Sequence, residues 1–109
     1  GNAAVLSDRI ETDAIKRVFG DHARRLSVSS TKAATGHLLC ASGAAEIIFT
    51  ALAMQHGIVP PTLNYEQPDP RCDLDYTPNR SRRREIRAAL SLTLGLSGEN
   101  AAVLMRPVA

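Results

Sequence analysis

The sequence contains no tryptophan, and its only other aromatic residues apart from histidine are two phenylalanines and two tyrosines. A surface that binds single-stranded nucleic acid stacks bases on several aromatic rings, and this chain offers few. The formal net charge is +2, which is too small to indicate binding to the phosphate backbone of a nucleic acid. We therefore expect no nucleic-acid partner.

Cysteine is equally scarce, with Cys40 and Cys72 as the two examples. Two cysteines do not make the disulfide framework of a small secreted domain, so a reduced compartment such as the cytoplasm is expected. No cysteine pair or cysteine–histidine pair has the spacing of a zinc site. We expect neither a metal nor a cofactor.

Long apolar runs are also missing. The longest candidate, residues 38–54, falls short of the roughly 20 residues that a membrane helix needs, and Glu46 lies in its middle. The first residues lack a charged start followed by an apolar run, so we expect no signal peptide and no membrane span. Hydrophobic residues make up 44% of the chain, which is typical of a globular domain or of a piece of a larger one.

The hydrophobic pattern predicts a helix, a strand, a second helix and two further strands. Asp8 and Glu11 have the spacing of a capping box and predict a first helix over residues 8–19. Alternation of apolar and polar residues predicts a short strand over 25–30. A long connection over 64–84 follows the second helix, with a brief edge strand at Leu74 and Tyr76. Residues 86–94 and 101–105 then form a hairpin. This order favours a layered α/β arrangement.

The second helix is predicted over residues 36–55, about 30 Å at roughly 1.5 Å per residue. It is apolar nearly all round, so it should be buried on every side. Its glycines cost helix propensity, which is acceptable where another backbone comes close. One short helix and a few strands can cover only part of such a helix. We infer that the chain is not a complete folding unit.

Polar residues at the start of this helix are candidates for chemistry. The helix dipole disfavours a protonated His37 at the N-terminus, and a neutral imidazole there can donate a hydrogen bond to developing negative charge. The alternative is a buried structural histidine. Glu46 is costly inside an apolar helix unless it is paired, and Lys32 is the nearest counter-charge in sequence. The alternative is a Glu46 that reaches the rim and an exposed Lys32.

The glycine-rich loop between the last two strands, Gly95–Asn100, can aim backbone N–H groups at one point and form an oxyanion site. The alternative is a plain hairpin turn. The basic run Arg80–Arg84 is typical of a solvated turn; the alternative for Arg82–Arg84 is contact with an acidic protein.

Four segments together resemble the β-ketoacyl-acyl-carrier-protein (ACP) synthases of the thiolase superfamily, closest to the elongating type. They are Ser29–Leu39 (Ser-Ser-x-Lys-x-x-x-Gly-His), Ala44-Ala45-Glu46, Pro60–Asn64 (Pro-Pro-Thr-x-Asn) and Cys72–Tyr76 with its Asp-Leu-Asp. The resemblance implies that residues 1–109 form the C-terminal portion of a thiolase-like, layered α-β-α fold that is incomplete on its own. It also implies a cytoplasmic protein, or one of the mitochondrial or plastid matrix.

This family catalyses decarboxylative Claisen condensation of an acyl group with malonyl-ACP. The resemblance makes His37 and Lys32 catalytic, with Glu46 and Asn100 in support. It assigns the oxyanion loop to three further residues, which are Gly95, Leu96 and Gly98. It implies an acyl carrier protein as partner and a homo- or heterodimer.

The family's nucleophilic cysteine lies in an N-terminal half, and neither Cys40, predicted in the buried helix, nor Cys72 replaces it. Gly1 matches a glycine of the family's first-histidine block, but Asn2 and its successors depart from that block. The glycine loop also departs, with Leu96 in place of an aromatic residue. Two hypotheses follow: a part of a working synthase joined to the cysteine-bearing half, or a non-catalytic subunit like a chain-length factor that pairs with an active synthase.

Overall fold

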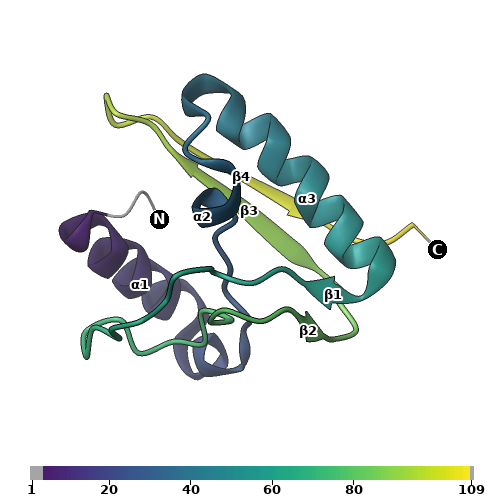
Figure 1. Ribbon diagram of the computed structural model, residues 1–109, viewed down its shortest axis with the longest axis horizontal. Coiled ribbons are helices and arrows are strands. Elements are labelled where there is room, and N and C mark those ends of the chain that lie inside the picture. Colours follow the sequence, from purple (N-terminus) through teal and green to yellow (C-terminus); the bar gives the residue numbers. More distant parts are fainter. Residues whose placement is uncertain (1–3, 109) are drawn as a thin grey trace. The chain divides into compact units, whose positions relative to one another are not determined.

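The computed structural model describes residues 4–108, which divide into two units. The first unit runs to residue 37 and includes 60–81; the second comprises 38–59 and the chain from 82 onward. The elements in chain order are α1 (Val5–Phe19), the 3-10 helix η1 (Gly20–Arg25), α2 (Lys32–Thr35), the 3-10 helix η2 (Leu39–Ala41), α3 (Ser42–His56), β1 (Ile58–Val59), β2 (Arg82–Arg83), β3 (Ala89–Leu94) and β4 (Asn100–Met105) (Figure 1).

The core of the first unit is small and forms where α1 meets η1 and the long connection. Its buried members are Ile15, Ala23 and Leu74, with partly buried apolar side chains packed around them: Phe19, Leu26, Val28 and Tyr76. Leu74 comes from the connection rather than from a strand. Burial of this one leucine therefore ties the connection to the helices through the hydrophobic effect.

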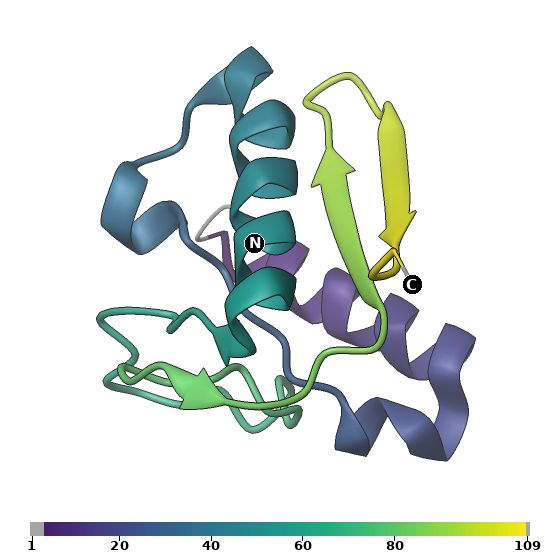
Figure 2. The same cartoon turned by 90° about the vertical axis from the view of Figure 1, so that its right-hand side faces the viewer.

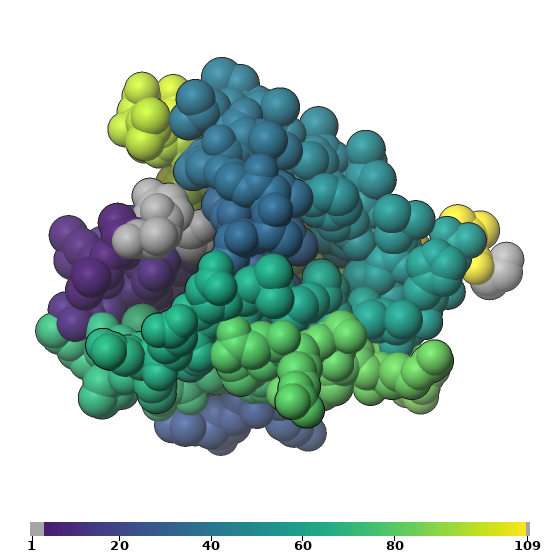
Figure 3. All heavy atoms as spheres, viewed as in Figure 1, coloured from purple at the N-terminus to yellow at the C-terminus, as the bar shows by residue number. Residues whose placement is uncertain are grey.

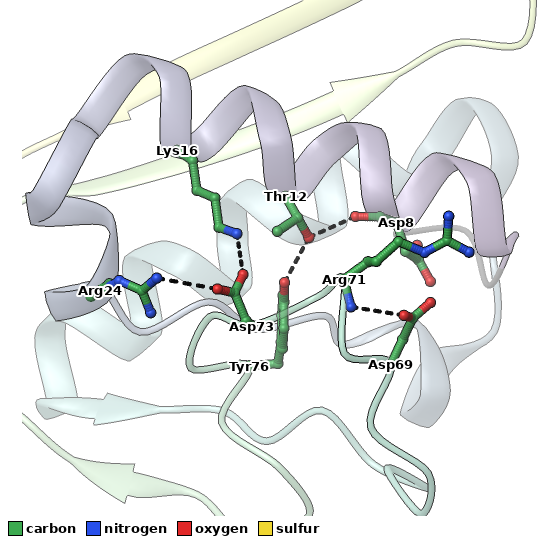
Figure 4. Close-up of polar contacts among 8 residues, drawn as sticks. All are labelled: Asp8, Thr12, Lys16, Arg24, Asp69, Arg71, Asp73 and Tyr76. Carbon is green, nitrogen blue, oxygen red and sulfur yellow. Dashed lines mark hydrogen bonds and ion pairs between the residues drawn. The ribbon is translucent and has the colours of Figure 1, made fainter.

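Polar contacts reinforce this packing along one side of α1 (Figure 4). The hydroxyls of Thr12 and Tyr76 lie 2.6 Å apart, and the Thr12 side chain is 1% exposed. Asp73 pairs with Lys16 of α1 and, at 3.3 Å, with Arg24 of η1. The Lys16 contact is the main reason why the pKa of Asp73 lies below its usual range.

Asp69 makes the corresponding contact near the start of the helix. Its carboxylate lies 2.7 Å from the Arg9 guanidinium and accepts a hydrogen bond from the backbone N–H of Arg71. That backbone bond, followed by the bond from Arg9, lowers the pKa of Asp69. The long connection is therefore held against α1 at Asp69 and Asp73.

The predicted start of α1 is wrong, whereas its end at Phe19 is confirmed. The helix begins at Val5, and the Asp8 N–H already donates to the Ala4 carbonyl at 3.1 Å. The cap residue Ala4 makes no side-chain cap bond, so Asp8 and Glu11 do not form a capping box. Asp8 instead lies in the first turn, where the helix dipole favours its charge.

The strand predicted over 25–30 is not a strand, and neither is the segment at Leu74 and Tyr76. Leu26 is extended, but the partners of the residues that follow are mixed. The Val28 N–H donates to the Asp75 carbonyl at 2.8 Å, while the Thr62 and Thr77 hydroxyls make other bonds to the same segment. A β-ladder needs a regular series of backbone bonds, and side-chain bonds replace part of that series here.

In the second unit, α3 packs along β3 of the β3–β4 hairpin, as Figures 1 and 2 both show. The hairpin is antiparallel and pairs Ala89 with Met105 through Leu94 with Asn100. Gly43 lies at a close approach of the two elements, because a Cβ there would lie 3.2 Å from the Thr93 hydroxyl. The hairpin prediction is confirmed, although β3 begins at Ala89 rather than at residue 86.

The single helix predicted over 36–55 is wrong. Gly36 and Leu39 have φ values of +76° and +50°, which an α-helix cannot contain. The segment therefore begins after α2, which ends at Thr35, and holds the turn η2 and then α3. Cys40 lies in η2 and is exposed, so its predicted burial in the helix is also wrong.

The helix α3 remains partly uncovered, as its all-round apolar sequence led us to expect. Ile48 is 58% exposed and Leu52 is 45% exposed. On β4, Leu104 is 63% exposed. The described residues thus cover only part of the apolar surface of this unit.

Arg82 and Arg83 form β2, an antiparallel partner of Ile58–Val59, rather than a plain turn. Both arginines are exposed, and their segment lies at the surface of the face seen in Figure 3. The predicted solvation of the basic run is therefore confirmed, and its predicted conformation is not.

No helix among residues 4–108 is long and apolar enough to cross a membrane. The positions of Gly1 and Asn2 lie outside the described residues.

Candidate functional site

Lys32 is the first residue of the single-turn helix α2 and is half-buried, and His37 lies two residues beyond the end of this helix at Thr35. The turn is closed by bonds from the Ala34 and Thr35 N–H groups to the Thr31 carbonyl, at 2.9 and 3.1 Å. The Gly36 N–H then donates to the Lys32 carbonyl at 2.8 Å. This short turn sets the separation of the two candidate side chains.

His37 is exposed and follows Gly36. The expectation that it sits inside a helix N-terminus is wrong, because α3 begins only at Ser42. The dipole argument for a neutral imidazole consequently does not apply. The alternative of a buried histidine is also wrong in this chain. An exposed imidazole beside a glycine is instead accessible to a substrate that approaches this segment.

The segment before α2 is hydrogen-bonded to the hydroxyl groups of Thr62 and Thr77. The Thr62 hydroxyl accepts a bond from the Ser30 N–H at 3.1 Å and donates to the Tyr76 carbonyl at 2.6 Å. The Thr77 hydroxyl donates to the Val28 carbonyl at 2.9 Å. The sequence patterns predicted no role for these threonines. The signal was present, since Thr62 belongs to the Pro-Pro-Thr-x-Asn segment.

Glu46 lies in α3 and is half-buried. Its backbone carbonyl accepts a bond from the Thr50 hydroxyl at 2.7 Å. Glu46 belongs to the second unit and Lys32 to the first. The predicted pairing of these two charges stays a prediction.

The loop between β3 and β4 is tight and exposed. Its N–H groups bond largely within the loop: Gly95 to the Glu99 carbonyl at 2.7 Å, Ser97 to the Glu99 carboxylate at 3.2 Å, and Gly98 to the Gly95 carbonyl at 3.4 Å. Within residues 95–98, the Leu96 N–H alone donates to no other described residue, and the Leu96 side chain is 91% exposed.

Asn100 closes this loop from the first position of β4. Its side-chain amide donates to the Gly98 carbonyl at 3.3 Å. Asn100 thus shapes the turn, which contains Gly98 at φ +94°. Among the backbone donors of residues 95–98, the Leu96 N–H is therefore the one that could donate a hydrogen bond to an oxyanion. No cluster of three or more histidine, cysteine or acidic side chains among the described residues could hold a metal ion.

A family profile described as "Beta-ketoacyl synthase, C-terminal domain" matches residues 1–66. Among curated proteins, Nodulation protein E of Rhizobium sp. (strain N33) is 51% identical over 108 residues, which are 99% of this chain and 27% of that protein.

Two solved structures are also similar. One contains a type II PKS acyl-carrier protein in complex with its ketosynthase; it has a TM-score of 0.88 and 42% identity over 91% of this chain and 24% of that one. The other is the ishigamide ketosynthase/chain length factor, with a TM-score of 0.94 and 31% identity over 100% of this chain and 27% of that one. The chain thus spans about a quarter of the length of these relatives. Its fold is the predicted thiolase-like α/β type.

Proposed function

The chain belongs to the β-ketoacyl synthase family, in its C-terminal domain, and we propose that it forms part of the active site of a 3-oxoacyl-ACP synthase. This acyltransferase condenses an acyl group with malonyl-ACP in fatty-acid or polyketide synthesis. The proposal rests on one observation above all. Lys32 and His37 lie on a single short segment, with the imidazole exposed, inside the part of the chain that the family profile matches.

In the proposed reaction, the bond between C2 of the malonyl group and its carboxylate carbon breaks, and carbon dioxide leaves. The electron pair stays on C2 and is shared with the thioester oxygen as an enolate. His37 donates a hydrogen bond to that oxygen, which stabilises the charge as it develops. Lys32 contributes a positive charge on the same segment, with Glu46 in support.

The second step needs a group that this chain does not supply. C2 attacks the carbonyl carbon of an acyl group held on a cysteine of the N-terminal half, and the carbon–sulfur bond breaks to release the thiolate. During the attack the carbonyl oxygen becomes an oxyanion. We assign the Leu96 N–H to that oxyanion, because a backbone donor serves this role whatever side chain it carries.

The partners we propose are the cysteine-bearing half and an acyl carrier protein, with assembly as a homo- or heterodimer. The apolar side chains left exposed on α3 and β4 support a covering partner. The solved relative whose title names an acyl-carrier protein in complex with its ketosynthase supports the second partner.

The experiment that tests this function is His37→Ala in the assembled synthase. We expect release of carbon dioxide from malonyl-ACP to fall by a factor of about 10² to 10⁴, which is typical for loss of a positioned donor. His56→Ala is the matched control, because His56 is also exposed but lies at the end of α3. Unchanged decarboxylation in His37→Ala would contradict the assignment.

The second candidate function is that of a non-catalytic subunit similar to a chain-length factor. The observation that favours it is the altered glycine loop, in which Leu96 stands where the family has an aromatic residue. The solved relative that includes a chain length factor is compatible with this reading. The residue at the nucleophile position of the adjoining half separates the two: a cysteine supports the synthase, and alanine or glutamine supports the partner subunit.

A further inference from the structure

The segment that leads into α2 is held at three successive residues, 28–30, by bonds to residues 60–77. Val28 is bonded through both of its backbone groups, to Asp75 at 2.8 Å and to the Thr77 hydroxyl at 2.9 Å. The Ser29 hydroxyl donates to the Pro60 carbonyl at 2.6 Å. The Ser30 N–H donates to the Thr62 hydroxyl at 3.1 Å. The last of these bonds lies two residues before Lys32.

Thr62 is the centre of this arrangement because its hydroxyl bonds in two directions. It accepts from Ser30 on one side and donates to Tyr76 on the other, at 2.6 Å. Its backbone is fixed as well, since its N–H donates to the Thr77 carbonyl and its carbonyl accepts from Asn79, both at 2.9 Å. The hydroxyl therefore cannot shift without losing one of its two partners.

Thr77 is also fixed by its surroundings. Its side chain is 0% exposed, and its φ is +51°, a region that a β-branched residue rarely adopts. Its N–H donates to the Asp75 carboxylate at 3.1 Å, which supports the unusual backbone. Unusual backbone of this kind persists only where the surroundings enforce it. Here the enforced geometry aims the Thr77 hydroxyl at Val28.

The position of His37 depends on these hydrogen bonds and on the backbone bonds of the turn α2. Ser30 is set by Thr62, the next residue accepts the bonds that close α2, and the Gly36 N–H returns to the Lys32 carbonyl. We propose that Thr62 and Thr77 are positioning residues, whose hydroxyls hold residues 28–30 so that Lys32 and His37 present their side chains correctly for malonyl decarboxylation. This inference rests on the proposed function.

The test replaces the hydroxyl of Thr62 without changing the shape of the side chain. In the assembled synthase, Thr62→Val is expected to lower kcat for malonyl decarboxylation by about 10- to 100-fold, since small misplacements of catalytic groups have effects of this order. Transfer of the acyl group onto the cysteine of the other half should stay within about twofold, because the proposal gives Lys32 and His37 no role in that step. Thr62→Ser restores the hydroxyl and should restore most of the decarboxylation rate.

The control is Thr12→Val, which removes a buried hydroxyl from the same unit without touching residues 28–30. It should lower stability and leave the ratio of the two rates unchanged. If Thr62→Val lowers both rates together, as a destabilised protein would, or lowers neither, the positioning role is wrong. If Thr62→Val does not fold, Thr62→Ala removes the same hydroxyl with less bulk, and the same split between the rates is expected.

Failure of this inference is distinguishable from failure of the proposed function. Loss of decarboxylation in His37→Ala together with full decarboxylation in Thr62→Val would overturn the positioning role alone. Retention of decarboxylation in His37→Ala would overturn both.

Discussion

Gly36 joins α2 to His37 in a backbone conformation that an L-amino acid with a side chain rarely adopts. Its φ is +76° and its ψ is 171°. A Cβ built on Gly36 would meet nothing within 4 Å. Gly36→Ala therefore introduces no clash, and its cost comes from the backbone alone. For a conformation that is essentially restricted to glycine, that cost is about 1–3 kcal/mol.

The variant chain can either accept this cost or relieve it by rotating residue 36 to a negative φ. Rotation would turn the backbone that follows and displace His37, which is the next residue. We expect Gly36→Ala to reduce malonyl decarboxylation in the assembled synthase by about 10- to 100-fold, with a loss of unfolding free energy of about 3 kcal/mol or less. Single-turnover carbon dioxide release and chemical denaturation measure the two quantities.

Gly20→Ala is the matched control because Gly20 also has a positive φ, +54°, and also has open space at its Cβ position. It ends α1 and does not lead into His37. Similar loss of stability with unchanged decarboxylation is expected for Gly20→Ala. If both variants lower the rate equally, or if Gly36→Ala leaves it unchanged, the link between the conformation of Gly36 and the position of His37 is wrong.

Three further outcomes follow from the packing. Because Asp69 and Asp73 have lowered pKa values, the stability they contribute is present above the unfolded pKa of about 3.9 and is lost as the pH falls through their folded pKa values. The hydrogen-exchange protection factors of the α1 amides, which correct for the intrinsic pH dependence of exchange, should therefore fall below about pH 4. Burial raises the pKa of Tyr76, so the stability that its neutral phenol contributes is lost as the pH rises above about 10. An absorbance titration of Tyr76 that gives an ordinary pKa would contradict this. Gly43→Val should lower the free energy of unfolding by about 1–3 kcal/mol through crowding against Thr93, and Thr93→Ala in the same protein should recover part of that loss.

Local patterns predicted the elements whose stability comes from neighbours in sequence. Period-two alternation around a glycine-rich turn was sufficient for the β3–β4 hairpin, because its two strands pair directly across the loop. The end of α1 at Phe19 was likewise predicted from Gly20, which lies in the positive-φ conformation expected after a helix. The motif around Lys32 and His37, read together with three other segments, was enough to predict the family.

Some of the errors fall where partners are distant in sequence, and others where the local backbone departs from the helix. The segment 26–30 alternates like a strand, but residues 28–30 bond to two hydroxyls and two carbonyls that lie 31 to 49 residues later in the chain. The helix predicted over 36–55 failed at Leu39, since leucine is a good helix former and nothing local predicts its φ of +50°. Thr77 could not be assigned, and only the Pro-Pro-Thr-x-Asn segment marks Thr62, because a sequence does not show which group a loop threonine bonds to.

The amino-acid sequence by itself determined the family, the class of fold and the two side chains, Lys32 and His37, on which the proposed chemistry depends. These depend on residue identity and short spacing, which a sequence displays directly. Only the tertiary structure decided how that segment is held, with His37 exposed beyond a positive-φ glycine and Thr62 bonded to Ser30 from 32 residues away. The physical reason is that hydrogen bonds between distant segments depend on the tertiary fold of the chain, which a local sequence pattern does not determine.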